Sequence, residues 1–505
     1  MAIALHSPSI RAPIHVLDDV SGLTSVPRGA ARTALLRWAQ HDFYHSLRLI
    51  NQATPIGSLP AEILGKIFEV ANRSKTTEDH YPWSNPYQWK PLPVAVSQVS
   101  SYWRDVALDS PLLWTEIDIS PPWSLKTICL FLRRSKACPI HLNLTIPTIA
   151  FGNLLTPAVV NASAHILCDH IAQHIPRCRK ISIKGDFHQL EPLLDAIINT
   201  ILPSGASQLE RLVMHITSVP DFQSDVHPTL FSQGFPVLTH VQVTSLMVPF
   251  LPSLPQVTSL QLALGDTHGI DLATFLALAA SCPSLETLTI FDDVICGPWP
   301  LTATIDFPFL RSLQIYGTFT SVSDLLRVVS APLLEDLVIA PVVADDLLAY
   351  HQHASTSAPK FSNLRSITLS PVSTSGFALL LLASECFPDV ERLTIPNIHA
   401  NSFCDILTGI HADIVWPNLK ALALRNVDAD AMQKLLTVMS FRKAAGWPLQ
   451  TLYLDAASLH RIAFTVSSFP PQVEVVEYDV WSMLHDEDLL HEAAHYVGND
   501  FDFIS

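Results

Sequence analysis

The sequence predicts an α/β protein in which a small all-α module is followed by an irregular repeat solenoid, a curved parallel sheet with helices on its convex side. Apolar residues make up 49% of the 505 residues and charged residues only 15%, so a large core can form. Near the N-terminus, apolar residues recur at the spacing of helices. From about residue 112 onward, one short apolar motif recurs many times, as in stacked repeat proteins.

The first 57 residues divide into two parts. Residues 1–28 contain three prolines and no apolar period, and we expect a disordered tail there. Residues 29–57 are expected to form an N-terminal helix, because apolar side chains recur every three or four positions from Leu36 to Ile50.

A small helical module is expected over 58–115. Its first helix starts at Pro60, since proline suits the first helical turn, and Glu62 places negative charge beside the helix N-terminus. Residues 72–93 are polar and then rich in proline and aromatic side chains, which indicates an inserted loop. A second helix is predicted from Val94 to Leu108. The module is too small to make a generous core alone, so its apolar stripe requires a partner.

The recurring motif reads apolar-x-x-apolar-x-apolar. Clear copies begin at Leu209, Leu238, Val257, Leu285, Leu310, Leu334, Leu364, Val390, Leu419 and Leu449, and weaker ones at Trp114, Pro139, Cys178 and Val473. Successive copies start about 28 residues apart, and helical stretches such as Leu272–Ala280 lie between many of them. One strand and one helix at this period are typical of leucine-rich repeats, whose strands line a concave face. We therefore assign 116–481 to a domain of this kind.

The repeats depart from the usual pattern at one position. The Asn or Cys expected after the strand is missing, and Val372, Ile398 and Val427 stand in its place. We therefore expect irregular repeats. An ordinary α/β sheet is the alternative, but it does not need so many similar strands. Residues 482–505 are expected to form a capping helix and an acidic tail.

The helical module followed by repeats resembles the F-box proteins with leucine-rich repeats, of the expanded fungal type. The matching stretches are Leu59–Phe68 (LPAEILGKIF), Val96–Trp103 (VSQVSSYW) and Ala107–Trp114 (ALDSPLLW), in the order found in that family. The resemblance implies that the module docks on a Skp-type adaptor, which connects it to a cullin and a RING-type ubiquitin ligase. It also implies that the repeats recruit a protein substrate, and that the chain is a non-catalytic receptor in the cytoplasm or nucleus.

The apolar stripe of the module is the candidate adaptor-binding surface, because a helix stripe that fills a partner's groove is a common recognition mode. The candidate residues are Leu59, Pro60, Ile63, Leu64, Ile67, Phe68, Val96, Val99, Trp103 and Trp114. The alternative is that each of these side chains belongs to an internal core between the module and the first repeats.

Alternate strand positions that face away from the core are the candidate substrate contacts. Those selected are Gln242, Gln261, Thr289, Gln314, Thr368, Thr394 and Tyr453, and Val213, Val338 and Ala423 hold the same position in other copies. They are mostly neutral and do not indicate an ionic target surface. The alternative is that they form an ordinary repeat face without a ligand.

Composition argues against several other classes of protein. Lys and Arg number 30 against 46 Asp and Glu, which gives a formal net charge of −16. A nucleic-acid-binding protein normally has a basic footprint, and an anionic membrane surface repels such a chain. The eight cysteines are scattered without a Cys-x-x-Cys pair, as is typical of buried thiols in a reducing compartment. We expect no nucleic-acid or membrane partner and no cofactor.

One motif suggests metal chemistry. His491-Glu492-Ala493-Ala494-His495 matches the H-E-x-x-H pattern, in which two histidines one helical turn apart hold zinc. Phe501 stands where a third histidine ligand would be, so a terminal helix packed on the last repeat is the better explanation. We predict no catalytic and no metal-binding residue. Two other hypotheses stay open, a zinc hydrolase that uses His491 and His495, and a repeat scaffold without a role in ubiquitin ligation.

Overall fold

The computed structural model describes most of the chain in two compact units, 1–113 and 114–505. The described residues are 54–73, 91–121, 123–146, 157–187, 190–217, 230–265, 269–297, 299, 304–316, 322–342, 344–354, 360–370, 376–396, 415–425, 427–462 and 473–478. The expected tail at 1–28, most of the expected helix at 29–57 and the expected C-terminal segment 482–505 lie outside them. Each unit is considered by itself.

The described residues of the first unit are mainly helical. A 3-10 turn, η1 (Ile56–Ser58), precedes α2 (Ala61–Arg73), and α3 (Leu92–Val96) and α4 (Ser101–Asp109) follow. The short η3 (Pro111–Trp114) starts in this unit, and its last residue, Trp114, is the first of the second unit. Ser100 caps α4, because its Oγ accepts a hydrogen bond from the amide of Trp103 at 3.1 Å. The predicted inserted loop 72–93 overlaps the end of α2 and the start of α3, and its middle, 74–90, lies outside the described residues.

Helix α2 approaches the C-terminal part of α4 closely at a glycine. A Cβ atom added at Gly65 would lie 3.2 Å from Ser110 Oγ and 3.7 Å from Val106 Cγ1. One turn further along α2, the ring of Phe68 packs against that of Trp103, with ring centroids 5.0 Å apart. The small residue lets the two helices meet, and the aromatic pair fills the space that widens beyond it.

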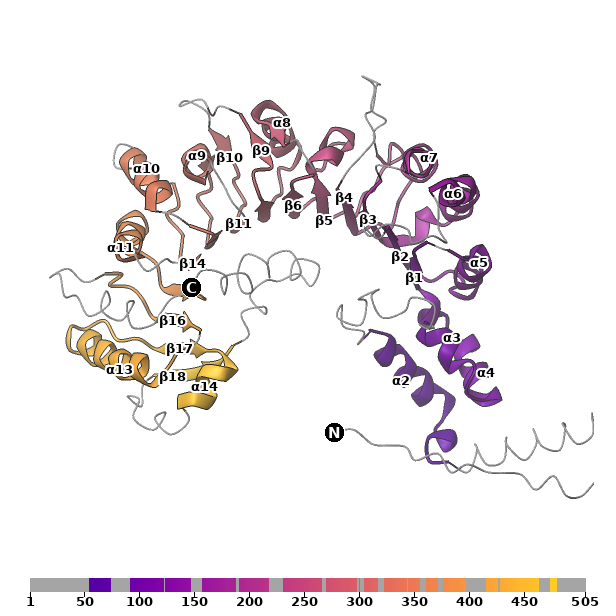
Figure 1. Ribbon diagram of the computed structural model, residues 1–505, viewed down its shortest axis with the longest axis horizontal. Coiled ribbons are helices and arrows are strands. Elements are labelled where there is room, and N and C mark those ends of the chain that lie inside the picture. The colour runs from indigo at the N-terminus through magenta and orange to yellow at the C-terminus, as the bar shows by residue number, and fades with distance from the viewer. Residues whose placement is uncertain are drawn as a thin grey trace, which may run out of the picture. The chain divides into compact units, whose positions relative to one another are not determined.

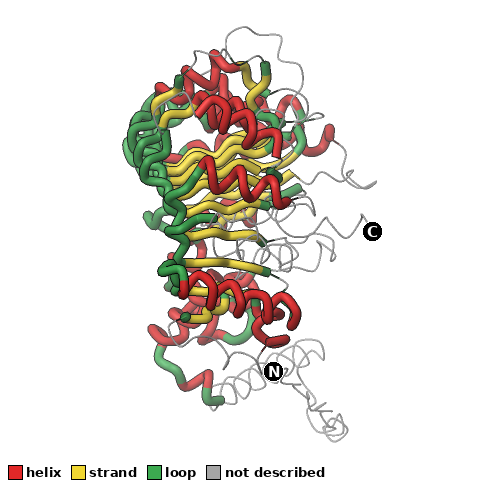
Figure 2. Tube along the Cα trace, turned by 90° about the vertical axis from the view of Figure 1, so that its left-hand side faces the viewer, coloured by secondary structure: helices red, strands yellow, loops and turns green. Residues whose placement is uncertain are grey.

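The described part of the second unit contains one fourteen-stranded sheet, in which the strands follow one another in chain order and every pair is parallel. The strands stack side by side along an arc (Figure 1) and lie alongside one another across it (Figure 2). They are β1 (Glu116–Ile119), β2 (Ile140–Ile146), β3 (Cys178–Gly185), β4 (Arg211–Ile216), β5 (His240–Thr244), β6 (Ser259–Ala263), β8 (Thr287–Phe291), β11 (Ser312–Tyr316), β13 (Asp336–Ala340), β14 (Ser366–Leu369), β15 (Arg392–Ile395), β16 (Ala421–Leu424), β17 (Thr451–Leu454) and β18 (Glu474–Glu477).

Helices connect many of these strands and cover the outer side of the arc from α5 to α11 (Figure 1). They are α5 (Leu125–Arg134), α6 (Pro157–Ala172), α7 (Glu191–Ala196), α8 (Leu272–Ser281), α9 (Val322–Val328), α10 (Ala344–Ala354), α11 (Gly376–Cys386), α13 (Ala429–Ala444) and α14 (Ala456–Ile462). Shorter elements are η4 (Ile175–Arg177), η5 (Ile197–Ile201), η6 (Ser245–Phe250) and two small parallel sheets, β7 (Ile270–Asp271) with β9 (Ile295–Cys296) and β10 (Ile305–Asp306) with β12 (Val329–Ser330). The prediction of an α/β chain with a long parallel sheet is confirmed.

Each copy of the sequence motif forms one of these strands. The motif's fourth and sixth residues alternate into the core, as Leu313 and Ile315 do on β11, and both are fully buried. The same two positions on β8, Leu288 and Ile290, lie directly opposite them in the register. Each strand buries its apolar side chains against those of its neighbours. A single repeat would leave these side chains exposed, so the repeats are stable only as a stack.

Many of the turns that precede the strands contain proline. Turns and loops lie together along one edge of the sheet in Figure 2. In Phe307–Leu310, for example, the Leu310 amide donates to the Phe307 carbonyl at 3.3 Å, and Pro308 holds the second position of the turn. Cys282–Leu285 repeats this arrangement around Pro283. The proline fixes the backbone angle that such a turn requires, which accounts for 38 prolines beside only 16 glycines. Val427, one of the residues that replace the expected Asn, is fully buried, and its amide donates to Ser458 Oγ at 2.8 Å.

Candidate functional site: two protein-interaction surfaces

Helix α2 has two different apolar faces. Leu64 and Phe68 are buried and point toward α4. Ile63, Ile67 and Val70 lie on another face, spaced four and three residues apart, and are 51%, 43% and 59% exposed. We call Ile63, Ile67 and Val70 the α2 ridge. Burying exposed branched side chains that recur along one helix face is favourable, so such a face is a candidate site for binding a partner.

The other candidate adaptor-binding residues divide in the same way. Pro60 and Val99 are exposed, Val99 to 57%, while Leu59 and Trp103 are half-buried. The start of α2 is held in place because the Tyr102 hydroxyl donates to the Leu59 carbonyl at 2.6 Å. Val96 is buried within the first unit.

Trp114 belongs to the second unit and is fully buried. Its ring lies 5.0 Å from that of Phe131, and the guanidinium of Arg134 sits 4.3 Å above it. Trp114 therefore packs on α5. Among the ten candidates, Leu64, Phe68, Val96 and Trp114 are buried inside the units, and the other six remain at least partly accessible.

The structure adds two exposed apolar residues that the sequence analysis did not select, Val70 and Leu112. Val70 completes the α2 ridge seven residues after Ile63, a spacing visible in the sequence. Beside the ridge, the exposed Lys66 forms an ion pair with Glu69, with 3.0 Å between Nζ and Oε2. The ridge is thus apolar along its length and bordered by charge.

The candidate substrate contacts lie in a single row across the sheet. The register places Gln242 opposite Gln261, Gln261 opposite Thr289, and Thr289 opposite Gln314, and continues in this way to Tyr453. The sequence analysis expected these positions to face outward. Instead Gln242, Gln261, Thr289, Gln314 and Thr394 are buried, and only Thr368 and Tyr453 are partly exposed.

A second row on the same face is more accessible. It lies two residues earlier on each strand and includes Arg211, His240, Ser259, Ser312 and Arg392. Every one of these five side chains is at least partly exposed. The sequence signal for this row is the third, polar residue of the motif, which alternation places on the same face as the fifth.

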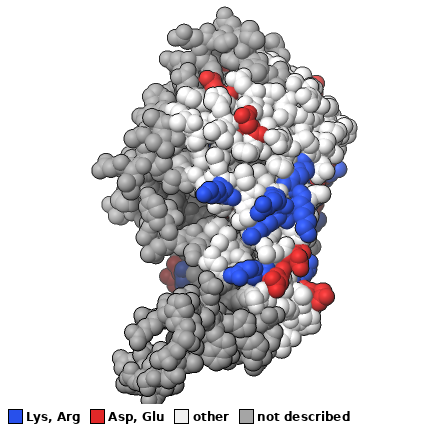
Figure 3. All heavy atoms as spheres, turned by 90° about the vertical axis from the view of Figure 1, so that its right-hand side faces the viewer, with Lys and Arg blue, Asp and Glu red and all other residues white. Residues whose placement is uncertain are grey.

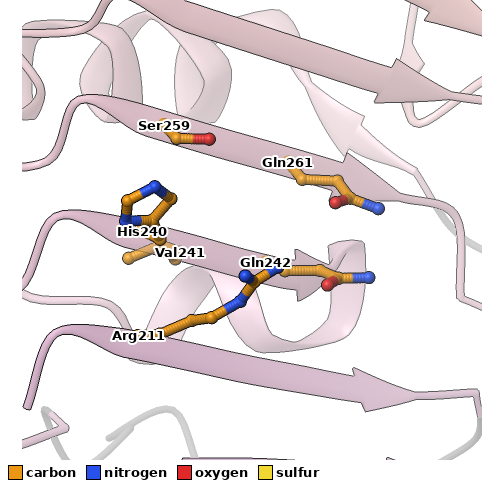
Figure 4. Close-up of a pocket in the computed structure, with 6 residues that line it drawn as sticks. All are labelled: Arg211, His240, Val241, Gln242, Ser259 and Gln261. Atoms are coloured by element: carbon orange, nitrogen blue, oxygen red, sulfur yellow. The ribbon is translucent and has the colours of Figure 1, made fainter. Parts of the chain in front are cut away.

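The two rows meet in a small pocket of about 10 Å³ on β4, β5 and β6. Figure 4 shows its lining, Arg211, His240, Val241, Gln242, Ser259 and Gln261, on three strands side by side. Gln242 and Gln261 are each only 5% exposed. Among the described residues, neither Gln242 Oε1 nor Gln261 Nε2 has a hydrogen-bond partner. Such groups are uncommon in folded proteins, because nearly all buried polar atoms are paired.

Basic side chains also gather on the face of the array shown in Figure 3, which includes α5 with Arg133 and Arg134 in its last turn. Two of the arginines here have structural partners. Arg134 covers the Trp114 ring, and Arg177 of η4 donates to the carbonyls of Leu132 and Cys138, each at 2.8 Å. Burial lowers the pKa of Arg177. Arg134 and Arg177 therefore have structural roles on this face.

The described residues contain no group of three or more His, Cys, Asp or Glu side chains that could hold a metal, and the histidines His491 and His495 lie outside them. The seven described cysteines are free thiols. Burial raises the pKa of Cys168 and of Cys178 to about 12, which keeps these thiols protonated and unreactive at neutral pH.

No described helix is both long enough and apolar enough to cross a membrane. Neither a protein-family model nor a curated protein matches the sequence. The function is therefore argued from the two surfaces themselves, the α2 ridge and the polar face of the sheet.

Proposed function

We propose that the chain is the substrate-recognition subunit of a cullin–RING ubiquitin ligase of the SCF type. The helical residues 58–115 dock on a Skp-type adaptor, and the strand array recruits a target protein. The chain itself carries out no chemistry, since ubiquitin transfer belongs to the ligase that the adaptor brings. The complex acts in the cytoplasm or nucleus.

The α2 ridge is the observation that carries this proposal. Ile63, Ile67 and Val70 stay exposed although Leu64 and Phe68 on the same helix already supply its internal packing. An amphipathic helix that keeps a second apolar face uncovered fits the recognition mode in which a helix stripe fills a partner's hydrophobic groove. Two of the three ridge residues, Ile63 and Ile67, fall within the stretch LPAEILGKIF, one of the three on which the resemblance to F-box proteins rests.

Co-expression with a Skp-type adaptor, followed by affinity purification, tests the proposal. We compare the wild type with the double variant Ile63→Asp, Ile67→Asp, in which two carboxylates replace exposed apolar side chains. We expect the wild type to retain the adaptor and the variant to lose it, with the loss of affinity about 100-fold or more, as for interface anchors. Lys66→Ala, on the same helix beside the ridge, is the matched control and retains the adaptor.

The result separates the proposal from its alternatives. A cullin that co-purifies with the wild type and adaptor supports the ligase role, whereas an adaptor complex that never contains a cullin favours a repeat scaffold. If wild type and the Asp variant behave alike, the α2 ridge is not the docking surface and the proposal is wrong. Equal melting temperatures for the variant and wild type show that the charges act on binding and not on folding.

A further inference from the structure

We infer that the outer face of α5 binds an acidic helix of a partner protein. Lys126, Leu130 and Arg133 form this face, which we call the α5 face. A further exposed cation, Lys136, follows two residues after the helix ends. The α5 face is distinct from the α2 ridge and from the polar face of the sheet, so the inference goes beyond the proposed function and does not depend on it.

Helical spacing places the three side chains of the α5 face in one stripe. They are four and three residues apart, and the two cations, seven residues apart, are separated by about 10 Å along the helix axis. Lys126 and Arg133 are exposed and Leu130 is half-buried, whereas Ile128 and Leu132 on the other side of the helix are buried. The stripe therefore faces away from the core, in keeping with the place of α5 on the outer side of the arc (Figure 1).

The positive charges of the α5 face are not neutralised within the described part of the chain. There the side chains of Lys126, Arg133 and Lys136 form no hydrogen bond and no ion pair, and Lys and Arg side chains gather on this side of the molecule (Figure 3). Residues 119–168 contain no Asp and no Glu. Burial and the nearby charge of Arg133 both lower the pKa of Arg134. This part of the surface therefore carries positive charge that is available to a ligand.

Two of the lysines stand where the local structure does not favour them. Lys126 lies in the first turn of α5, at the positive end of the helix dipole, where an acidic side chain would be stabilising. Lys136 has a φ of 52°, a left-handed conformation that glycine adopts at the lowest cost. Helix formation alone explains neither lysine, and an anionic partner accounts for both.

The shape of the α5 face indicates what kind of anion it takes. It is a convex stripe with a partly exposed leucine between two cations, and a second helix can pack along it with the axes about 8–10 Å apart. A partner helix with Glu, an apolar residue and Glu at the same spacing would pair with both cations and cover Leu130. The occupant is therefore a helix with carboxylates seven residues apart.

A nucleic acid fits this surface less well. Its affinity grows with the number of phosphates that basic side chains neutralise, and Lys126, Arg133 and Lys136 can neutralise few. The chain as a whole carries a net charge of −16, which repels a polyanion that extends beyond the α5 face. RNA is therefore a comparison ligand in the test.

Fluorescence anisotropy on the full-length chain tests the inference. The probe is a fluorescein-labelled, alanine-rich helical peptide of about 18 residues in which Glu and Leu alternate at spacings of four and three. One comparison peptide has the same composition with its Glu residues spread around the helix, and another has Gln in place of Glu. Circular dichroism checks that the peptides are equally helical, and a single-stranded RNA of the same charge is titrated in parallel. We expect saturable binding of the probe, and binding about fivefold or more weaker for both comparison peptides.

Lys126→Glu separates binding from folding. It replaces an attraction by a repulsion, so the affinity for the probe should fall about fivefold or more. The same change puts an acid at the positive end of the helix dipole, so the melting temperature should equal or exceed that of the wild type. Arg392→Glu is the matched control, because it makes the same change of charge at an exposed arginine on β15. It should leave the affinity within about twofold, since charges far apart are screened.

Several results would overturn the inference. These are no binding of the probe, equal binding of either comparison peptide, tighter binding of RNA, or wild-type affinity in Lys126→Glu. Arg133→Gln, which should also weaken binding, remains decisive if Lys126→Glu does not fold. The adaptor assay is independent of this one. Lys126→Glu should retain the adaptor, and the variant Ile63→Asp, Ile67→Asp should bind the probe as the wild type does, so either proposal can fail alone.

Discussion

At the scale of single residues, the most informative side chain is Arg442 in the last turn of α13. It is fully buried, and its guanidinium donates to the carbonyls of Val415 and Trp416 at 3.1 and 2.7 Å. Burial lowers its pKa to about 10, so it remains charged at neutral pH. Arg442 ties the helix that follows β16 back to the turn that precedes it, a link that no local sequence pattern predicts.

Replacing Arg442 by Met tests this link. Met fills much of the volume but donates no hydrogen bond, so the Val415 and Trp416 carbonyls each lose a charged donor, and the Trp416 carbonyl keeps the Leu419 amide. We expect the free energy of unfolding to fall by about 2–4 kcal/mol, measured by urea denaturation, because hydrogen bonds to a charged group are strong. Lys443→Met, an exposed neighbour on the same helix, should change the stability by less than about 0.5 kcal/mol. A change of equal size in both variants would contradict the structural role of Arg442.

At the scale of elements, alternating charges link the strand starts. Residues at or immediately before the strand starts form ion pairs across neighbouring repeats, as between Arg179 and Glu210 or between Arg311 and Glu335. Glu391 is the centre of such a group, since Lys420 Nζ lies 2.8 Å and Arg365 Nε 3.9 Å from its carboxylate. The hydrogen bond from Lys420 and the two positive charges lower the pKa of Glu391.

This lowered pKa predicts a pH dependence. A carboxyl whose pKa is lower in the folded state stabilises the fold above its unfolded pKa, near 4.5, and loses that contribution as the pH falls through the folded value. Glu391→Gln should therefore lower the stability at pH 7 by at most about 1 kcal/mol, because the pair is exposed to solvent. The difference from wild type should shrink below pH 4.5 in thermal unfolding experiments. Glu474→Gln, at the start of β18, is the control, and an equal effect there would contradict the prediction.

The same scale shows what the sequence could predict and what it could not. All motif copies, strong and weak, form strands, because the apolar rows they supply have only one way to be buried together. Less of the structure of the helical module could be predicted from the sequence. Ile63 and Leu64 are neighbours of similar character, yet one is exposed and the other buried, since the packing partner on α4 decides which face is covered. Likewise Gln242 and Gln261 look like surface residues in the sequence, yet both are buried in the folded sheet.

At the scale of the whole molecule, the described sheet is one-dimensional, with each strand paired only to its neighbours in chain order. Leu313 on β11 and Leu452 on β17 occupy the same motif position and are both fully buried, but one lies in the middle of the array and the other near its end. They form a natural pair for testing how far stability is shared along the repeats.

We expect the two Leu→Ala variants to lose similar amounts of stability but to differ in how many strands show increased hydrogen exchange. Each creates a cavity that costs about 2–5 kcal/mol locally. In a stack of nearest-neighbour contacts, Leu313→Ala should increase hydrogen exchange on both sides of β11, whereas Leu452→Ala should increase it mainly in β16 to β18. Hydrogen exchange followed by mass spectrometry separates the two patterns. Uniform loss of protection in both variants would instead indicate one cooperative unit.

The order of the strands has a consequence for synthesis. Because each described strand pairs with its predecessor in the chain, a repeat that leaves the ribosome finds its partner already folded and does not wait for distant segments. The growing array always has an open edge during translation, and this edge attracts other chains until the next strand covers it. The last described strand, β18, carries exposed Glu474 and Glu477 at its two ends, and charged side chains on a strand disfavour its pairing with other chains.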